Sequence, residues 1–143
     1  MTVPAHDQTL SLSLLCHIPP HEPREHDPHY AIFLATKRRM RKQGLLRCAI
    51  IGCTYPGPIE LHHSQVEFSL QGGVDVRKFD VVWGLHLSDE EFAEYIEGPG
   101  NLEPLCPVHH RTHLGVHALP EPFWNAVRVW KVELPPPAEH ITQ

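Results

Sequence analysis

The stretch from Asn101 to His113 constrains this chain most, because it concentrates metal-binding side chains in thirteen residues. It contains one asparagine, one cysteine and three histidines, in the order Asn-Leu-Glu-Pro-Leu-Cys-Pro-Val-His-His-Arg-Thr-His. Pro107 suits the first position of a helix, where a missing N–H costs nothing. Gly115 suits the left-handed residue that follows a last helical turn. We therefore predict a short loop and then a helix that ends just before Gly115, with side chains that are solvated separately or share metal ions.

The chain has 143 residues, which is enough for one domain with a modest core. Its fifteen prolines lie mainly toward the two ends, so the part that folds is shorter than the whole. A core of that size is expected to need a staple, either a metal or a disulfide. We predict a flexible arm over residues 1–26, one domain over residues 27–134 and a flexible tail over residues 135–143.

Four cysteines leave the choice of staple open, because an even number also suits two disulfides in a secreted protein. However, the apolar residues 9–15 are too few for a signal peptide and lack its basic lead-in. No apolar run is long enough to cross a membrane. Cysteines with histidines beside them in a cytoplasmic chain favour metal over disulfide. Cys16 lies apart from the other three and is interpreted as a spare thiol.

The first predicted metal site joins two short ligand pairs. In the sequence Cys48-Ala-Ile-Ile-Gly-Cys53, Gly52 lets the backbone turn tightly, so that both sulfurs face one ion. Cys106 and His109 form the second pair, at the start of the predicted helix. Four sulfur and nitrogen ligands in two pairs match a closed, tetrahedral structural Zn²⁺ site. The alternative is a set of buried free cysteines beside a surface histidine.

A third motif lies between these pairs. Residues 59–63 look like a short strand that ends in His62-His63, and successive strand residues point to opposite faces. The whole pattern is Cys48-x4-Cys53, His62-His63 and Asn101-Leu-x-x-Leu-Cys106-x2-His109-His110, over about residues 47–114. It resembles the HNH (His-Me finger, ββα-metal) endonucleases with a zinc-stapled core. The combination of motifs carries the resemblance, since each motif alone is weak.

The resemblance implies a role for each matching residue. His62 corresponds to a ligand of the catalytic metal, and His63 to the general base that activates water. Asn101 corresponds to the residue that ties the loop back to the backbone and helps to hold the base. His110 corresponds to the metal ligand on the helix. Some members, such as the bacteriocin DNases, add a helical histidine four residues further on. His113, three residues further on, is the candidate here.

The resemblance also implies an α+β fold. We expect a small zinc-stapled ββα-metal core over residues 47–115, preceded by a helix. An insertion over about residues 66–98 would separate the ββ part from the α part. The cofactors would be a structural Zn²⁺ and a catalytic divalent ion, Mg²⁺ or Mn²⁺ first, although the ligands also suit Zn²⁺ or Ni²⁺. The family suggests the cytoplasm of a bacterial or phage-infected cell.

A basic helix is predicted before the first cysteine pair. Asp27 and Pro28 open it and Gly44 closes it. We predict that a set of basic residues contacts a phosphate backbone, namely Lys37, Arg38, Arg41, Arg47 and Arg111. The alternative is a solvated basic face. The net charge of −5 argues against a protein coated in positive charge, but it is compatible with a local patch.

Patterns in the rest of the chain are less regular. Residues 66–70 alternate like a strand, and residues 79–83 are predicted as a buried strand or an irregular core segment. Ser88 to Glu91 is a capping box that starts a short helix. Its acidic face is most simply solvated, and it consists of Asp89, Glu90, Glu91, Glu94 and Glu97. Residues 119–134 carry an aromatic stripe predicted as core, where periodicity leaves helix and strand both open.

The residue types suit hydrolysis of a phosphodiester. Histidine supplies a base near neutral pH, and a divalent ion stabilises charge at the phosphate and the departing oxygen. We therefore predict a metal-dependent DNA endonuclease with a one-metal HNH mechanism and no membrane association. The alternative is a non-catalytic, zinc-stapled module that binds DNA or a protein partner through the acidic insertion or the proline-rich tails. A secreted disulfide protein is a third, weaker hypothesis.

Overall fold

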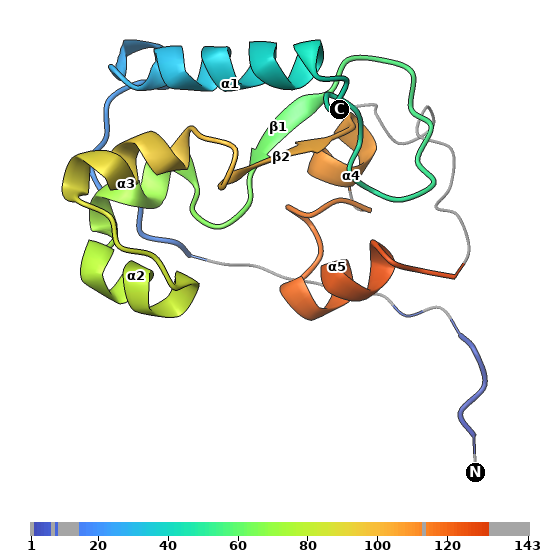
Figure 1. Cartoon of the computed structure of the whole chain (residues 1–143). Helices are drawn as coiled ribbons and strands as arrows, with labels where there is room; N and C mark the ends of the chain where they lie inside the picture. The colour runs from blue at the N-terminus through green and yellow to red at the C-terminus, as the bar shows by residue number, and fades with distance from the viewer. Residues whose placement is uncertain (1, 7, 9–14, 113, 132–143) are drawn as a thin grey trace.

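The centre of the fold is a two-stranded antiparallel sheet, in which β1 (Glu60–His63) pairs with β2 (Leu102–Leu105). The register sets His62 opposite Glu103. The structure, a computed structural model, describes residues 2–6, 8, 15–112 and 114–131. Within those residues the chain has the predicted α+β character, with the sheet lying among several short helices (Figure 1).

The observed order of elements corrects three predictions. β2 falls in the stretch predicted as a loop, whereas residues 66–70, predicted as a strand, enter a 3₁₀ helix, η2 (Phe68–Gly73). The insertion therefore lies between the two strands and not between the ββ and α parts. The sequence did not indicate β2 as a strand because it contains Pro104, and proline is uncommon within strands. Pro104 has no N–H, but its carbonyl accepts a hydrogen bond from Ala49 N (2.8 Å), which ties β2 to the first cysteine loop.

Helices cover both faces of the sheet. α1 (Tyr30–Lys42) packs on one face, where Phe33 contacts Leu61 and Leu102 in a small apolar cluster. The very short α4 (Pro107–Arg111) follows β2 directly and contacts both strands (Figure 1). Because side chains alternate along a strand, residues on either side of Leu61 face away from α1. Each face of the sheet therefore offers a separate environment.

The start of α1 differs slightly from the prediction. Asp27 and Pro28 precede the helix, which begins at Tyr30. Asp27 Oδ1 accepts a hydrogen bond from His29 N (2.7 Å), so that the aspartate closes a turn instead of capping the helix. A short 3₁₀ helix, η1 (Arg24–His26), lies just before this turn.

The insertion forms a small helical unit with its own core. α2 (Val76–Trp83) and α3 (Asp89–Ile96) bring Phe79, Phe92 and Ile96 together. The predicted capping box at the start of α3 is confirmed by reciprocal hydrogen bonds between residues 88 and 91, at 3.0 and 3.1 Å. α3, which carries most of the acidic run, lies between α1 and α2 (Figure 1).

The predicted buried strand over residues 79–83 is wrong, because this segment is helical. Asp75 caps α2 by accepting a hydrogen bond from Lys78 N (3.1 Å), and the helical period then turns successive residues to different sides. Phe79 is buried, whereas Val81 and Val82 are 84% and 73% exposed. The apolar run therefore contributes less to the core than its composition indicates.

The C-terminal segment resolves the choice between helix and strand in favour of a helix, α5 (Glu121–Val127). Trp124 is buried in the cluster around the cysteines, but Phe123 and Trp130 are about half exposed. The aromatic stripe was therefore only partly a core feature. Residues 132–143, which include the end of the predicted domain, lie outside the described residues. Among the described residues, every helix is too short or too polar to span a lipid bilayer.

Asn101 is fully buried and joins the two ends of the insertion, a junction that we call its neck. Its Oδ1 accepts hydrogen bonds from Gln65 N (2.9 Å) and Val66 N (3.0 Å). Its Nδ2 donates to Val66 O (3.0 Å) and Ile96 O (2.9 Å). Its backbone carbonyl accepts a hydrogen bond from Ser64 N (2.7 Å). One side chain thus joins the segment that follows β1 to the end of α3.

Asn101→Ala should lower the free energy of unfolding by about 3 kcal/mol, because it leaves the buried carbonyl of Ile96 and the half-buried backbone groups of Gln65 and Val66 without these partners. Chemical denaturation of the purified protein measures this effect. Asn125→Ala, at an exposed position in α5, is the matched control and should change stability by less than about 0.5 kcal/mol. Equal stability of the two variants would contradict this account of the neck.

Candidate functional site

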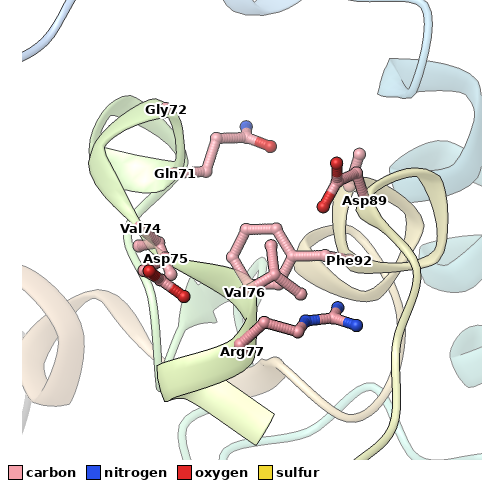
Figure 2. Close-up of a pocket in the computed structure, with 9 residues that line it drawn as sticks. Gln71, Gly72, Val74, Asp75, Val76, Arg77, Asp89 and Phe92 are labelled. Carbon is pink, nitrogen blue, oxygen red and sulfur yellow. The ribbon is translucent and has the colours of Figure 1, made fainter.

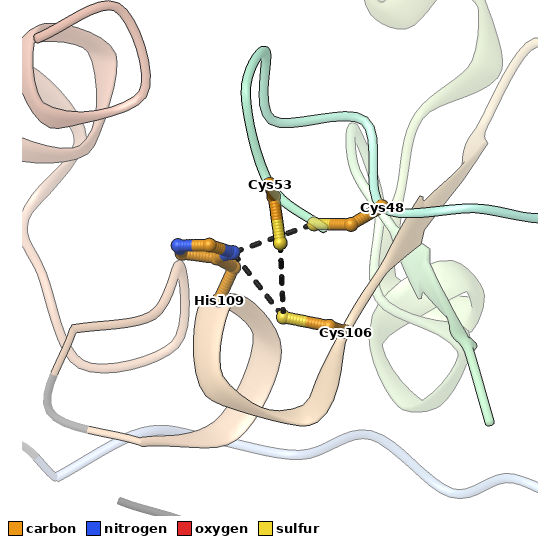
Figure 3. Close-up of side chains that lie close together, drawn as sticks. All are labelled: Cys48, Cys53, Cys106 and His109. Atoms are coloured by element: carbon orange, nitrogen blue, oxygen red, sulfur yellow. Dashed lines mark hydrogen bonds between the residues drawn. The ribbon is translucent and has the colours of Figure 1, made fainter. Parts of the chain in front are cut away.

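Four residues predicted as zinc ligands converge at the junction of β2 and α4. The ligand atoms of Cys48, Cys53, Cys106 and His109 all lie within 4.8 Å of one another. His109 Nδ1 lies 3.3 Å from Cys48 Sγ and 3.2 Å from Cys106 Sγ, and the Sγ atoms of Cys53 and Cys106 are 3.9 Å apart. Figure 3 shows the four side chains pointing toward one another.

Local sequence brings these ligands together. Gly52 has a positive φ of 88°, which side-chain-bearing residues rarely adopt, and it turns the loop so that Cys53 faces Cys48. Cys106 occupies the N-cap position of α4. His109 lies three residues later, on the same side of the helix. The first pair is thereby held against the second across the edge of the sheet (Figure 3).

The donor set fits zinc. Tetrahedral zinc with Zn–S bonds of about 2.3 Å places its sulfurs about 3.8 Å apart, close to the separation of Cys53 and Cys106. The hydrogen bond with Cys106 and burial raise the pKa of Cys48 to about 11, and the same hydrogen bond lowers the pKa of Cys106. Burial raises the pKa of Cys53. Three sulfurs in one small volume therefore resist full ionisation unless a cation joins them.

Zinc affinity should fall as the pH is lowered, because protons compete with the ion for the sulfurs. With their raised pKa values, Cys48 and Cys53 carry protons near neutral pH, so at least two protons leave for each zinc bound. The affinity is expected to drop by at least roughly 100-fold per pH unit. Competition with a chelator of known pH dependence measures this slope, and an affinity that does not change with pH would exclude thiol ligands.

A second cluster consists of His62, His110 and His117, whose ligand atoms also lie within 4.8 Å of one another. The Nε2 atoms of His110 and His117 are 3.0 Å apart. The ring of His62 lies edge-on to both other rings, with centroids 5.3 Å from His110 and 4.8 Å from His117. Among the described residues, the buried Nδ1 of His62 has no hydrogen-bond partner.

The surroundings keep this cluster suited to a cation. Glu60 Oε1 lies 2.8 Å from Nδ1 of His110, so an Nδ1–H donated to the carboxylate leaves the Nε2 lone pair facing the other rings. Burial, together with the charges that His117 and His110 would carry, lowers the pKa of His62 to about 3. Burial likewise lowers the pKa of His117. The neutral form of imidazole, which is the form that binds metals, is therefore favoured.

His117 was not predicted, and the reason lies in the length of α4. The helix ends at Arg111 and Gly115 has no positive φ, so the predicted helix up to Gly115 is wrong. The chain instead folds back, and Val116 N donates a hydrogen bond to His109 O (2.8 Å). A Cβ on Gly115 would lie 2.8 Å from Val108 O, which makes this close return possible only for glycine.

The predicted ligand His113 lies outside the described residues. Gly115 was the available signal for His117: it indicates a reversal that brings the next histidine back toward the helix.

His117→Ala should weaken the binding of a second divalent ion to the zinc-loaded protein by at least about 10-fold, because it removes one of three ligands. Ni²⁺ suits imidazole nitrogens, and isothermal titration calorimetry measures its affinity. His26→Ala, at an exposed histidine in η1, is the control and should bind Ni²⁺ as the wild type does. An unchanged affinity in His117→Ala would remove this residue from the site.

His63 and His62 are neighbours in β1 but face opposite sides of the sheet, as the strand period requires. The His63 ring stacks near Phe33 of α1, with centroids 6.3 Å apart, and its Nε2 lies 2.5 Å from Glu97 Oε1. Both histidines also line one groove of about 590 Å³, bordered by Trp83 and Arg128. The two histidines therefore have different partners, but both border the same groove.

The predicted basic residues do not form one group. Lys37 and Arg41 border a hollow of about 310 Å³ on the α1 side, and Arg38 and Arg47 are exposed. Arg111 lies beside the histidine cluster, where its Nε donates to Glu60 Oε1 (2.9 Å). The structure therefore associates only Arg111 directly with the three histidines.

Another hollow, of about 510 Å³, lies between α2 and α3 (Figure 2). Two of its charged residues, Asp75 and Arg77, already have partners within the insertion. Asp75 caps α2, and Arg77 donates to the carbonyl of Leu87 and pairs with Asp80. We therefore assign this hollow to the packing of the insertion and not to the candidate site.

No family model matches the chain, and comparison with curated proteins and with solved structures finds no match either. The chemistry of the two clusters therefore rests on their own geometry.

Proposed function

We propose that this chain is a metal-dependent endonuclease that hydrolyses DNA phosphodiester bonds by a one-metal, HNH-type mechanism. The observation that carries the proposal is the convergence of His62, His110 and His117 beside a groove that His63 also lines. In this proposal the Cys/His cluster is a structural zinc site that holds β2 and α4 in position. The short segment between Leu102 and Arg111 then serves both sites.

The three histidines would hold the catalytic ion. A divalent ion bound there would stabilise the negative charge that develops on the phosphate and on the departing oxygen. Three imidazole nitrogens suit Zn²⁺ and Ni²⁺ better than Mg²⁺, which prefers oxygen ligands. Glu60 orients His110 and also accepts a hydrogen bond from Arg111. Arg111 would thereby be held within reach of a phosphate bound at the metal ion.

In this mechanism His63 is the general base. It takes a proton from water, the water oxygen bonds to phosphorus, and the bond from phosphorus to the departing sugar oxygen breaks. That oxygen takes a proton from solvent, and His63 returns its own proton to solvent. Asn101 supports the base indirectly, because it fixes the backbone that follows His63. Lys37, Arg38, Arg41 and Arg47 remain predicted contacts to more distant phosphates.

Cleavage assays test this proposal. The zinc-loaded protein is incubated with supercoiled plasmid, single-stranded DNA, branched DNA and RNA, each with Mg²⁺, Mn²⁺, Ni²⁺ or Zn²⁺. We expect cleavage of a DNA form that requires added metal and is lost in His110→Ala, while His26→Ala cuts like the wild type. A wild type that cuts nothing, or a His110→Ala variant that cuts equally well, would contradict the proposal.

A second function, non-catalytic binding of DNA or a protein partner, is favoured by one observation. The insertion presents Val81 and Val82 of α2 to solvent, an apolar surface that hydrolysis does not require. This alternative predicts no cleavage with any metal and partner binding that survives His110→Ala. Val82→Asp would then abolish the binding.

A further inference from the structure

A carboxylate from the insertion lies against the proposed base. Glu97 follows the last residue of α3, in the run that the sequence indicated as a solvated acidic face. That prediction is wrong for Glu97, whose side chain is only 1% exposed. Its Oε1 lies 2.5 Å from His63 Nε2, and its Oε2 accepts a hydrogen bond from Arg24 Nη2 (3.2 Å).

The ring of His63 is held on several sides. Phe33 stacks on it with an interplanar angle of 19°, and Phe68 lies at a centroid distance of 6.4 Å. Arg24 in turn lies 3.8 Å from the centroid of Phe33, so the guanidinium is fixed above the same aromatic side chain. The pair formed by His63 and Glu97 therefore sits in a packed environment that restricts rotation of both groups.

This contact determines which ring nitrogen carries the proton. An ionised carboxylate only accepts hydrogen bonds, so Nε2 of His63 must donate to Glu97. In a neutral ring the lone pair is then on Nδ1, and the hydrogen bonds of the described residues engage only Nε2. A general base requires a free lone pair on the nitrogen that meets the water.

We propose that Glu97 is a positioning residue, which fixes the tautomer and the orientation of His63 so that Nδ1 is the nitrogen that accepts the proton. Arg24 pairs with the second carboxylate oxygen and holds Glu97 in place. The inference rests on the proposed function, because it assigns His63 as the base. It also gives the insertion a role, because the residue at the C-cap of α3 supplies one of the site's groups.

Nitrogen-15 NMR of the histidine rings tests the tautomer independently of activity. The chain has thirteen histidines, so His63→Gln identifies the His63 signals by their loss. At a pH where the ring is neutral, we expect the proton on Nε2 in the wild type and a shift toward the Nδ1-protonated form in Glu97→Gln, because an amide can donate to Nε2. A neutral wild-type ring protonated on Nδ1, or the same tautomer in both proteins, would overturn the inference.

Single-turnover cleavage of the DNA form that the wild type cuts provides the second readout. Glu97→Gln should lower the rate constant by about 10²- to 10⁴-fold. DNA affinity should change little, because a proton on Nδ1 of His63 prevents it from acting as the base but leaves the surface that contacts DNA unchanged. Glu94→Gln, an exposed position on the same helix, should keep the wild-type rate. Equal rates in both variants would overturn the positioning role. An inactive wild type would instead refute the proposed function, while the NMR result still reports on the contact.

Discussion

Cys106→Ser is expected to abolish zinc binding at the Cys/His cluster and, with it, the cooperative folding of the sheet and α4. Cys106 is fully buried at the N-cap of α4, and its sulfur lies close to two of the other three ligand atoms. A serine hydroxyl does not replace a thiolate at structural zinc. Structural zinc sites contribute about 10–16 kcal/mol in small zinc-binding peptides near neutral pH, which is comparable to the whole stability of a domain.

The effect is measured by the zinc content of the purified variant and by its thermal unfolding curve. Cys16→Ser is the matched control, because Cys16 is exposed and lies apart from the cluster. It should retain one zinc per chain and the wild-type melting temperature. A Cys106→Ser protein that melts cooperatively at the wild-type temperature would show that the three clustered cysteines are ordinary core residues.

His63→Gln is expected to lower DNA cleavage by about 10²- to 10⁴-fold, the usual contribution of a general base. Glutamine is chosen because its amide can still donate a hydrogen bond to Glu97, so that the buried carboxylate keeps a partner. Alanine would leave Glu97 paired only with Arg24 and would mix a folding defect with a catalytic one.

The comparison is made under single-turnover conditions with saturating metal, and zinc content and melting temperature are measured on the same preparation. We expect both properties to remain at wild-type values, because the substitution removes neither zinc ligands nor a metal-binding histidine. Full activity in a folded His63→Gln protein would remove the proposed base.

The Cys/His cluster was predictable because its ligands are local. Cys48 and Cys53 are separated by four residues, one of which is a glycine, and Cys106 and His109 by less than one helical turn, so sequence spacing alone limits their geometry. The same is true of the two histidines that end β1. Sequence spacing does not bring the two ligand pairs together; the sheet does. However, a buried four-ligand site leaves few other ways to combine two such pairs.

The features that sequence did not predict depend on distant contacts. β2 is short and contains Pro104, so it has no strand pattern and exists because β1 and Ala49 supply its partners. His117 depends on a chain reversal that follows from the close approach of Gly115 to α4. Glu97 belongs to an acidic run, and only tertiary packing distinguishes it from its solvated neighbours.

In the proposed arrangement one short segment, β2 and α4, serves two metal ions with different roles. Anomalous diffraction from crystals soaked in Ni²⁺, recorded at the zinc and nickel edges, locates both ions. We expect a zinc peak among Cys48, Cys53, Cys106 and His109 and a nickel peak among His62, His110 and His117. A nickel peak elsewhere, or density for disulfides in place of the zinc peak, would rule out this arrangement.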